Sequence, residues 1–108
     1  IFIIAELSAN HNQDVNLAKS IIKSAKLAGA DAIKLQTYTP DSLTLDVKSS
    51  IFKAGDLWSD KYLYDLYKSA SMPYEWHKEL FEYAKEVGII IFSSPFDLEG
   101  IDLLEELN

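Results

Sequence analysis

Two stretches of this chain follow the same order: a helix with an apolar stripe, a terminating glycine, and then an apolar strand. The first helix ends at Gly29 and leads into a strand predicted at 31–37, and the second ends at Gly88 and leads into a strand predicted at 89–94. Another strand is expected at 2–7, where β-branched and aromatic residues form a nearly continuous apolar run. Strands and helices that alternate with short connections are typical of right-handed parallel crossovers. The chain is therefore predicted to have an α/β fold with a parallel sheet.

Signals at the helix ends support this order. Asp14 is the predicted N-cap of the first helix, and the apolar residues after it recur at helical spacing: Ala18, Ile21, Ile22, Ala25 and Ala28. Pro73 is expected to open the second helix, because proline is tolerated at the first helical position. Asp97 is expected to cap a third helix over 98–107, with its acidic residues on a solvated face.

A long segment, 39–71, separates the second strand from the helix that should follow it. Such connections are normally a few residues long, and an extended one at this position is often functional. The alternative is a surface excursion without function, and the residues leave both interpretations open. The segment is irregular over 39–60, and a short amphipathic helix is expected over 62–70.

The strand–helix pattern suits either a doubly wound sheet or a TIM barrel. Three βα units alone bury little surface and leave two open sheet edges. The chain also begins inside an apolar run without an initiator methionine and ends within or just after a helix. We therefore expect residues 1–108 to form the first three βα units of a TIM (β/α)8 barrel from a longer protein, with an insertion after strand 2.

The composition narrows the classes of partner. A net charge of −7 argues against a general surface for nucleic acid or anionic membranes. The chain has no cysteine, which excludes a disulfide framework and a thiolate metal site. No apolar run approaches the length of about 20 residues that a membrane helix needs, and no signal peptide is visible. These features fit a cytoplasmic enzyme.

Polar residues occur at the carboxyl end of each predicted strand, where ligands collect in both α/β architectures. Lys34 and Gln36 lie two residues apart in the second strand and therefore share one face, while Glu6 and Ser94 end the other strands. A lysine, an amide and a hydroxyl suit a phosphate or carboxylate, and a carboxylate beside them suits sugar hydroxyls or proton transfer. Solvated strand ends are the alternative, but the convergence of three strands favours a binding site.

The two histidines lack the spacing of a metal site. His11, in the first loop, is expected at the same rim, and a contact with substrate and a structural hydrogen bond are equally open for it. His77 is expected on a helix flank as a surface residue. The first loop contains no glycine, which argues against a dinucleotide-binding fingerprint and a P-loop.

Three motifs make the sequence resemble the sialic acid synthase family. They are residues 3–12 (IIAELSANHN), 29–37 (GADAIKLQT) and 92–97 (FSSPFD), and the similarity extends over almost the whole chain in the same order. Within the family the chain is most similar to the pseudaminic acid branch, through features that include residues 55–58 (GDLW) and 73–77 (PYEWH).

The resemblance implies an N-terminal TIM barrel, a C-terminal antifreeze-like domain and a homodimer, with the rest of the barrel and the second domain outside residues 1–108. It implies a transferase that forms a C–C bond. Phosphoenolpyruvate condenses with the aldehyde of an N-acetylated amino sugar to give a nine-carbon keto acid and phosphate. For the pseudaminic branch the sugar is a diacetamido-trideoxy-altrose; N-acetylneuraminate or legionaminate synthesis is the alternative. A divalent metal, manganese or magnesium, polarises the aldehyde. Its ligands are expected beyond Asn108, so the fragment alone is expected to be inactive.

The resemblance also implies roles for individual residues. Lys34 and Ser94 would bind phosphoenolpyruvate, Glu6 would bind the sugar and assist proton transfer, and the remaining sugar contacts would come from Gln36, Asn10 and His11. Sugar choice is expected to depend on the insertion, through Lys53, Asp56 or Trp58.

Two other functions fit the sequence less well. A different phosphoenolpyruvate-using barrel, such as a keto-deoxy-octulosonate phosphate synthase, needs basic residues for a sugar phosphate, and few are present here. A non-catalytic α/β module that binds a small molecule would be complete at 108 residues.

Overall fold

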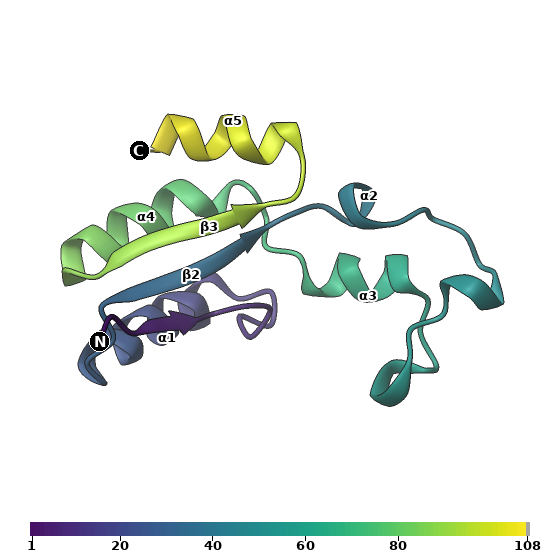
Figure 1. The fold of residues 1–108 in the computed structure, drawn as a ribbon, viewed down its shortest axis with the longest axis horizontal. Coiled ribbons are helices and arrows are strands. Elements are labelled where there is room, and N and C mark those ends of the chain that lie inside the picture. Colours follow the sequence, from purple (N-terminus) through teal and green to yellow (C-terminus); the bar gives the residue numbers. More distant parts are fainter. Residues whose placement is uncertain (108) are drawn as a thin grey trace.

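The computed structural model describes residues 1–107 and has three βα units. The elements in chain order are β1 (Ile4–Glu6), α1 (Val15–Leu27), β2 (Ala32–Thr37), α2 (Pro40–Leu43), the 3₁₀ turns Ser50–Phe52 and Asp56–Trp58, α3 (Leu63–Ala70), α4 (Trp76–Val87), β3 (Ile90–Pro95) and α5 (Leu98–Leu107). Figure 1 shows the three strands side by side, with the insertion extending away from their carboxyl ends. The predicted α/β fold and the place of the insertion are confirmed.

The sheet has the order β1-β2-β3, and both strand pairs are parallel, as predicted. The register sets Ile4 opposite Ala32 and Ala32 opposite Ile90. β1 is shorter than the expected strand over 2–7, because only Ile4–Glu6 pair in a regular ladder with β2. The carbonyl of Ile3 and the N–H of Leu7 nevertheless bond to residues of β2 or its approach, which extends the contact at both ends.

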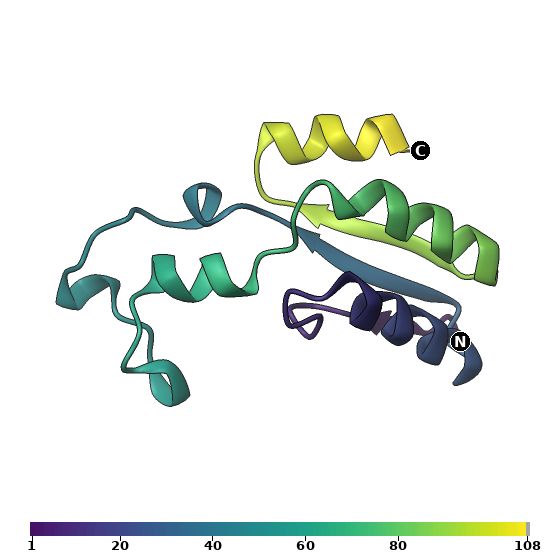
Figure 2. The same ribbon diagram turned by 180° about the vertical axis from the view of Figure 1, so that it is seen from behind.

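Helices α1 and α4 cover one face of the sheet, as the view from behind shows (Figure 2). The core lies between these helices and the strands, and its buried members are Leu7, Ala18, Ile22, Ile33, Leu35, Met72, Leu80, Ala84 and Ile89. Helix α5 packs beside β3. Because every second strand residue points toward α1 and α4, the intervening residues point to the other face, which no helix of residues 1–107 covers.

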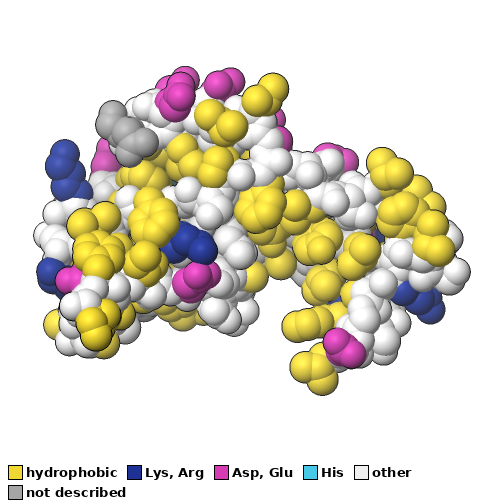
Figure 3. Space-filling model, viewed as in Figure 1, with side chains coloured by type: hydrophobic (Ala, Val, Ile, Leu, Met, Phe, Trp, Pro, Cys, Tyr) yellow, Lys and Arg dark blue, Asp and Glu magenta, His cyan; other side chains and the backbone are white. Residues whose placement is uncertain are grey.

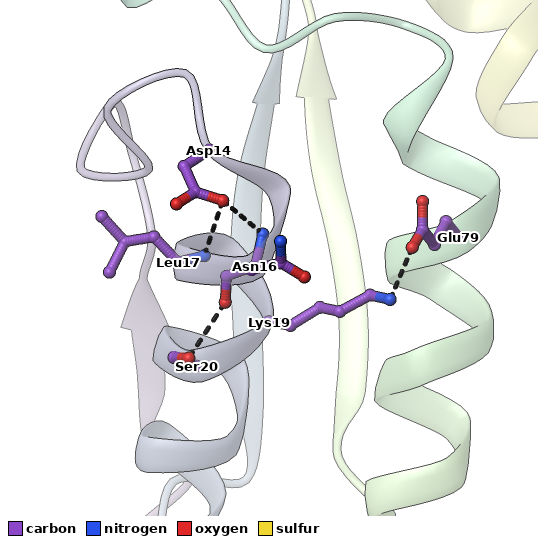
Figure 4. A network of polar contacts seen from close by, with 6 residues as sticks. All are labelled: Asp14, Asn16, Leu17, Lys19, Ser20 and Glu79. Atoms are coloured by element: carbon purple, nitrogen blue, oxygen red, sulfur yellow. Dashed lines mark hydrogen bonds and ion pairs between the residues drawn. The ribbon is translucent and has the colours of Figure 1, made fainter.

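The ends of α1 match the sequence signals. The carboxylate of Asp14 accepts hydrogen bonds from the backbone N–H groups of Asn16 (2.8 Å) and Leu17 (3.4 Å), which satisfies donors that a helix start leaves free (Figure 4). The same view shows Lys19 reaching across to Glu79, an ion pair that joins α1 to α4. Gly29 follows α1 with a φ of +91°, a conformation that favours glycine.

Helix α4 begins at Trp76, so the prediction that Pro73 opens it is wrong. Residues 73–77 form a tighter turn first, in which Trp76 N–H donates to the Pro73 carbonyl at 3.1 Å and His77 N–H donates to the Tyr74 carbonyl at 3.1 Å. The helix ends at Gly88, with a φ of +74°, as expected. Asp97 accepts a hydrogen bond from the N–H of Gly100 at 2.7 Å, which confirms it as the cap of α5.

The insertion contains α2, the two 3₁₀ turns and α3, and α3 lies where a short helix was predicted. Its end is fastened to the first loop by the side-chain amide of Gln13, which donates to the carbonyls of Ser69 (3.1 Å) and Ser71 (2.6 Å). Tyr38 packs edge-to-face on Tyr67 with ring centroids 6.1 Å apart. Among residues 1–107, no helix is long and apolar enough to cross a membrane.

Candidate active site

The polar residues predicted at the strand ends lie together on the open face of the sheet. The register sets Glu6 of β1 opposite Lys34 of β2, and Gln36 of β2 opposite Ser94 of β3. Strand parity places these four side chains on the face away from α1 and α4. Figure 3 shows this face, where basic and acidic side chains lie side by side among apolar ones.

Lys34 and Glu6 form an ion pair, with 2.9 Å between the ammonium Nζ and the carboxylate Oε1. The side chain of Lys34 is 26% exposed and that of Glu6 is 51% exposed, so both groups can be reached from the open face. An ammonium group can donate three hydrogen bonds, and Glu6 accepts one of them. Lys34 can therefore hold its acidic neighbour and still donate to an anion. The pair fits both interpretations of the sequence, a lysine with an acidic neighbour and a cation in an anion site.

Gln36 and Ser94 lie beside each other on the same face, two residues further toward the carboxyl ends of β2 and β3 than Lys34 and Phe92. Both are half-buried, and they are direct partners in the register. An amide supplies donors and an acceptor, and a hydroxyl supplies one donor and two lone pairs. Together with the ion pair, the open face offers a cation, an anion and two neutral groups along the carboxyl ends of three strands.

The first loop places its two candidate residues differently. Asn10 is exposed, and its side-chain amide donates to the carbonyl of Leu7 at 3.0 Å. His11 is fully buried, with its ring edge-to-face on Trp76 of α4 at a centroid distance of 5.6 Å. The Nδ1 atom of His11 accepts from the N–H of Gln13 at 3.1 Å. The structure therefore does not bring His11 to the ion pair, and its contact with a sugar stays a prediction.

The surroundings of His11 fit the structural alternative. Burial lowers the pKa of His11, and the backbone of Ala70 opposes this in part. Because Nδ1 accepts a hydrogen bond, the neutral ring carries its proton on Nε2. Within residues 1–107, that Nε2 atom has no hydrogen bond of normal geometry.

His77 is fully buried, so the prediction of a surface residue is wrong. Its Nε2 lies 2.7 Å from Oγ1 of Thr37, which also lies 2.6 Å from Oγ of Ser93. The sequence did contain a signal, because His77 shares helical spacing with Leu80 and Ala84, both in the core. A polar residue on an apolar stripe resembles a flank position when only its own helix is considered, and Thr37, which bonds to its Nε2, lies 40 positions away in the chain.

A cavity of about 450 Å³ lies between the first loop and the insertion. Its lining includes Asn10, Asn12, Tyr38, Trp58, Lys61 and Tyr67. Of the three insertion residues expected to govern sugar choice, Trp58 lines this cavity, and Lys53 and Asp56 are not among its lining residues. The cavity is lined by residues of both the first loop and the insertion. Both segments follow the carboxyl ends of strands, which is the end of the sheet that carries the candidate site.

Residues 1–107 contain no group of three or more His, Asp or Glu side chains that could hold a metal ion. Both histidines are buried on the helix-covered side, where His11 packs on Trp76 and His77 bonds to Thr37. The part of the chain described here therefore offers no ligand set for the divalent metal that the resemblance implies.

Comparisons with known proteins identify a family and several similar synthases. A profile of the NeuB family matches residues 21–108. The pseudaminic acid synthase of Helicobacter pylori is 55% identical, over 98% of this chain and 32% of that protein. The pseudaminic acid synthase of Campylobacter jejuni (strain 81-176) is 56% identical, over 100% of this chain and 32% of that protein. An N,N'-diacetyllegionaminic acid synthase of Campylobacter jejuni is 37% identical, over 97% of this chain and 32% of that protein.

A solved structure matches the fold as well. The crystal structure of N-acetylneuraminic acid (sialic acid) synthetase from Leptospira borgpetersenii, in complex with citrate, aligns with a TM-score of 0.81 and 30% identity. The alignment covers 100% of this chain and 33% of that one. The parallel three-stranded sheet is thus consistent with the N-terminal part of a TIM barrel. The chain spans about a third of the length of the curated relatives it matches.

Proposed function

Because the chain belongs to the NeuB family, we propose that it is part of a synthase that condenses phosphoenolpyruvate with an N-acetylated amino sugar. The product would be a nine-carbon keto acid of the sialic acid type. The observation that carries the proposal is the Lys34–Glu6 ion pair, which lies on an open sheet face with Gln36 and Ser94. These groups match the demands of an anionic substrate and a polyhydroxylated one.

The pseudaminic acid branch is the proposed branch. Identity to two pseudaminic acid synthases is 55% and 56%, against 37% for the legionaminic acid synthase. Synthesis of legionaminate or N-acetylneuraminate is the second candidate, and it is favoured only by these lower similarities and by the fold match. The sugar proposed for the whole protein is therefore a diacetamido-trideoxy-altrose.

The residues of this chain can be assigned roles in that reaction. The ammonium of Lys34 binds the carboxylate or phosphate of phosphoenolpyruvate, and the hydroxyl of Ser94 donates to the same ligand. The amide of Gln36 bonds to the sugar. The carboxylate of Glu6 accepts from a sugar hydroxyl, and its ion pair with Lys34 holds the two substrates side by side. This placement brings C3 of phosphoenolpyruvate toward the sugar aldehyde, after which water adds at C2 and phosphate leaves.

The proposal extends to features of the whole protein. A divalent manganese or magnesium ion, when bound, would polarise the aldehyde, but residues 1–107 hold no ligand set for it and no role above depends on it. We further propose a cytoplasmic homodimer in which a C-terminal antifreeze-like domain follows the completed barrel.

An assay of the whole protein tests the proposal. It supplies phosphoenolpyruvate with the diacetamido-trideoxy-altrose, with N-acetylmannosamine, or with no sugar, and measures phosphate release and the keto acid product. We expect rapid turnover with the altrose sugar and none without sugar. Faster turnover with N-acetylmannosamine would overturn the branch. Binding of phosphoenolpyruvate without turnover on either sugar would favour the non-catalytic module instead.

A further inference from the structure

Three side chains form a hydrogen-bonded group directly behind the candidate site, which we call the Thr37–His77–Ser93 network. Oγ1 of Thr37 is 2.7 Å from Nε2 of His77 and 2.6 Å from Oγ of Ser93. Thr37 and His77 are fully buried, and Ser93 is half-buried. The network links the end of β2 with β3 and with the first turn of α4.

The direction of each hydrogen bond follows from the ring of His77. Its Nδ1 lies 3.2 Å from the Tyr74 carbonyl and 3.3 Å from the Pro73 carbonyl, and carbonyl oxygens only accept. Nδ1 therefore carries the proton. Burial lowers the pKa of His77, which keeps the ring neutral, so Nε2 accepts from the hydroxyl of Thr37. Since Thr37 uses its one hydrogen there, Ser93 must donate to Thr37.

The network has a specific place relative to the open face. Thr37 follows Gln36 in β2, and Ser93 precedes Ser94 in β3. Because successive strand residues alternate between faces, the network bridges the two strands on the covered side, directly behind the Gln36–Ser94 pair on the open side. Through the carbonyl bonds of His77 it also ties these strand ends to the turn that follows the insertion.

A buried polar group is costly unless it is fully bonded, whereas a fully bonded one fixes a single arrangement. We propose that His77 is a positioning residue: through Thr37 and Ser93 it holds the ends of β2 and β3, so that Gln36 and Ser94 face the two substrates together. This inference rests on the proposed function, because the consequence of correct placement is the binding of sugar and phosphoenolpyruvate.

Kinetics of the whole protein test this role with Thr37→Val, which removes the hydroxyl, and Thr37→Ser, which keeps it. We expect Thr37→Val to raise KM for both substrates about tenfold, the scale of one lost hydrogen bond, and Thr37→Ser to restore KM to within about twofold. Thr44→Val, in the insertion, is the matched control with unchanged KM. A purely structural role would reduce only the amount of folded enzyme, which lowers the apparent turnover and leaves both KM values unchanged. That result would overturn the inference.

A second pair of variants addresses His77 itself. The amide oxygen of His77→Gln can accept from Thr37 in place of Nε2, whereas the shorter His77→Asn cannot reach it. We expect His77→Gln to keep KM near its original value and His77→Asn to behave like Thr37→Val. Equal KM values in the two variants would contradict the role.

A crystal structure of the whole Thr37→Val protein provides a readout that does not depend on activity. Displaced Gln36 and Ser94 side chains would support the positioning role, and unchanged ones would overturn it. If the unaltered protein consumes no phosphoenolpyruvate, the proposed function fails, and the structure still decides whether the network positions these residues.

Discussion

The two faces of the sheet differ in what covers them and in which residues they carry. On the covered face, Ile33 and Leu35 are fully buried against the helices. On the open face, Lys34 lies between them in the sequence yet pairs with Glu6 and remains accessible. Ile90 and Phe92 on the open face are also exposed, and this is the face that a TIM barrel encloses. One face thus carries the core, and under the proposed function the other carries the groups for chemistry, so adjacent residues of one strand should be separable by mutation.

The largest expected effect comes from the covered face. Leu35→Ala removes a fully buried side chain from the core and leaves a cavity, so the free energy of unfolding should fall by about 2–5 kcal/mol. Urea unfolding of the whole protein measures this loss. Leu27→Ala is the control, because Leu27 is 77% exposed at the end of α1, and it should shift the unfolding midpoint little. A large rise in KM with unchanged stability in Leu35→Ala would contradict the separation of the faces.

Lys34→Ala tests the neighbouring residue on the open face. Under the proposed function Lys34 is a charged donor to phosphoenolpyruvate, so its loss should lower kcat/KM of the whole protein about 100-fold, or about 2.7 kcal/mol. Unfolding should change little, because a partly exposed ion pair contributes little stability. Lys23→Ala, an exposed lysine of α1, is the matched control and should retain activity. Turnover near the original value in Lys34→Ala would remove Lys34 from the site.

The covered side should also respond to pH, since both histidines are buried there. Burial lowers the pKa of His11 and His77 below the ordinary value of 6.5, so the unfolded chain binds protons more readily. The stabilisation from neutral histidine is therefore complete above pH 6.5 and is lost as the pH falls toward the folded pKa. Between pH 7 and 5.5 we therefore expect the free energy of unfolding to fall, because both histidines take up protons more readily in the unfolded chain.

Urea unfolding at several pH values measures that loss. His77→Gln should reduce the pH dependence in this range, because one of the two buried histidines no longer titrates. An unfolding free energy that is independent of pH from 7 to 5.5 would show that the histidines are not buried in the neutral form.

The comparison of the faces also explains what the sequence could predict. The alternation of side chains along a strand placed Lys34 and Gln36 on one face. The meeting of parallel strand ends at one edge of the sheet placed Glu6 and Ser94 beside them. Both rules need only local spacing in the sequence, so both could be applied without a structure. The same reasoning placed Asp14, Gly29 and Gly88 at helix ends. Local spacing cannot show which polar residue finds a partner across the fold.

The two histidines demonstrate that limit. His77 can be buried because the hydroxyl of Thr37, 40 positions earlier, donates a hydrogen bond to its Nε2. His11 is buried because the first loop turns back under Trp76. Asn12 and Gln13 adopt left-handed backbone conformations in this loop, and the sequence there has no glycine that would have predicted them. The predicted start of α4 at Pro73 was wrong for a related reason. Proline is compatible both with the first turn of a helix and with the separate turn at 73–76, which is closed by a backbone hydrogen bond.

The smallest expected effect compares two ion pairs of nearly equal exposure, one on each side of the sheet. Lys34–Glu6 has exposed fractions of 26% and 51%, and Lys19–Glu79, between α1 and α4, has 27% and 51%. Glu6→Gln keeps the size of the side chain and an oxygen that can accept from Lys34, so the free energy of unfolding should change by less than about 0.5 kcal/mol. Glu79→Gln should be equally mild. Their effects on activity should differ, because only Glu6 lies on the open face proposed to bind the substrates: Glu6→Gln should lower kcat, and Glu79→Gln should leave it unchanged. If Glu6→Gln instead destabilised the protein by more than about 1 kcal/mol while turnover was kept, the ion pair would be a structural element, and the proposed role of Glu6 in the reaction would be wrong.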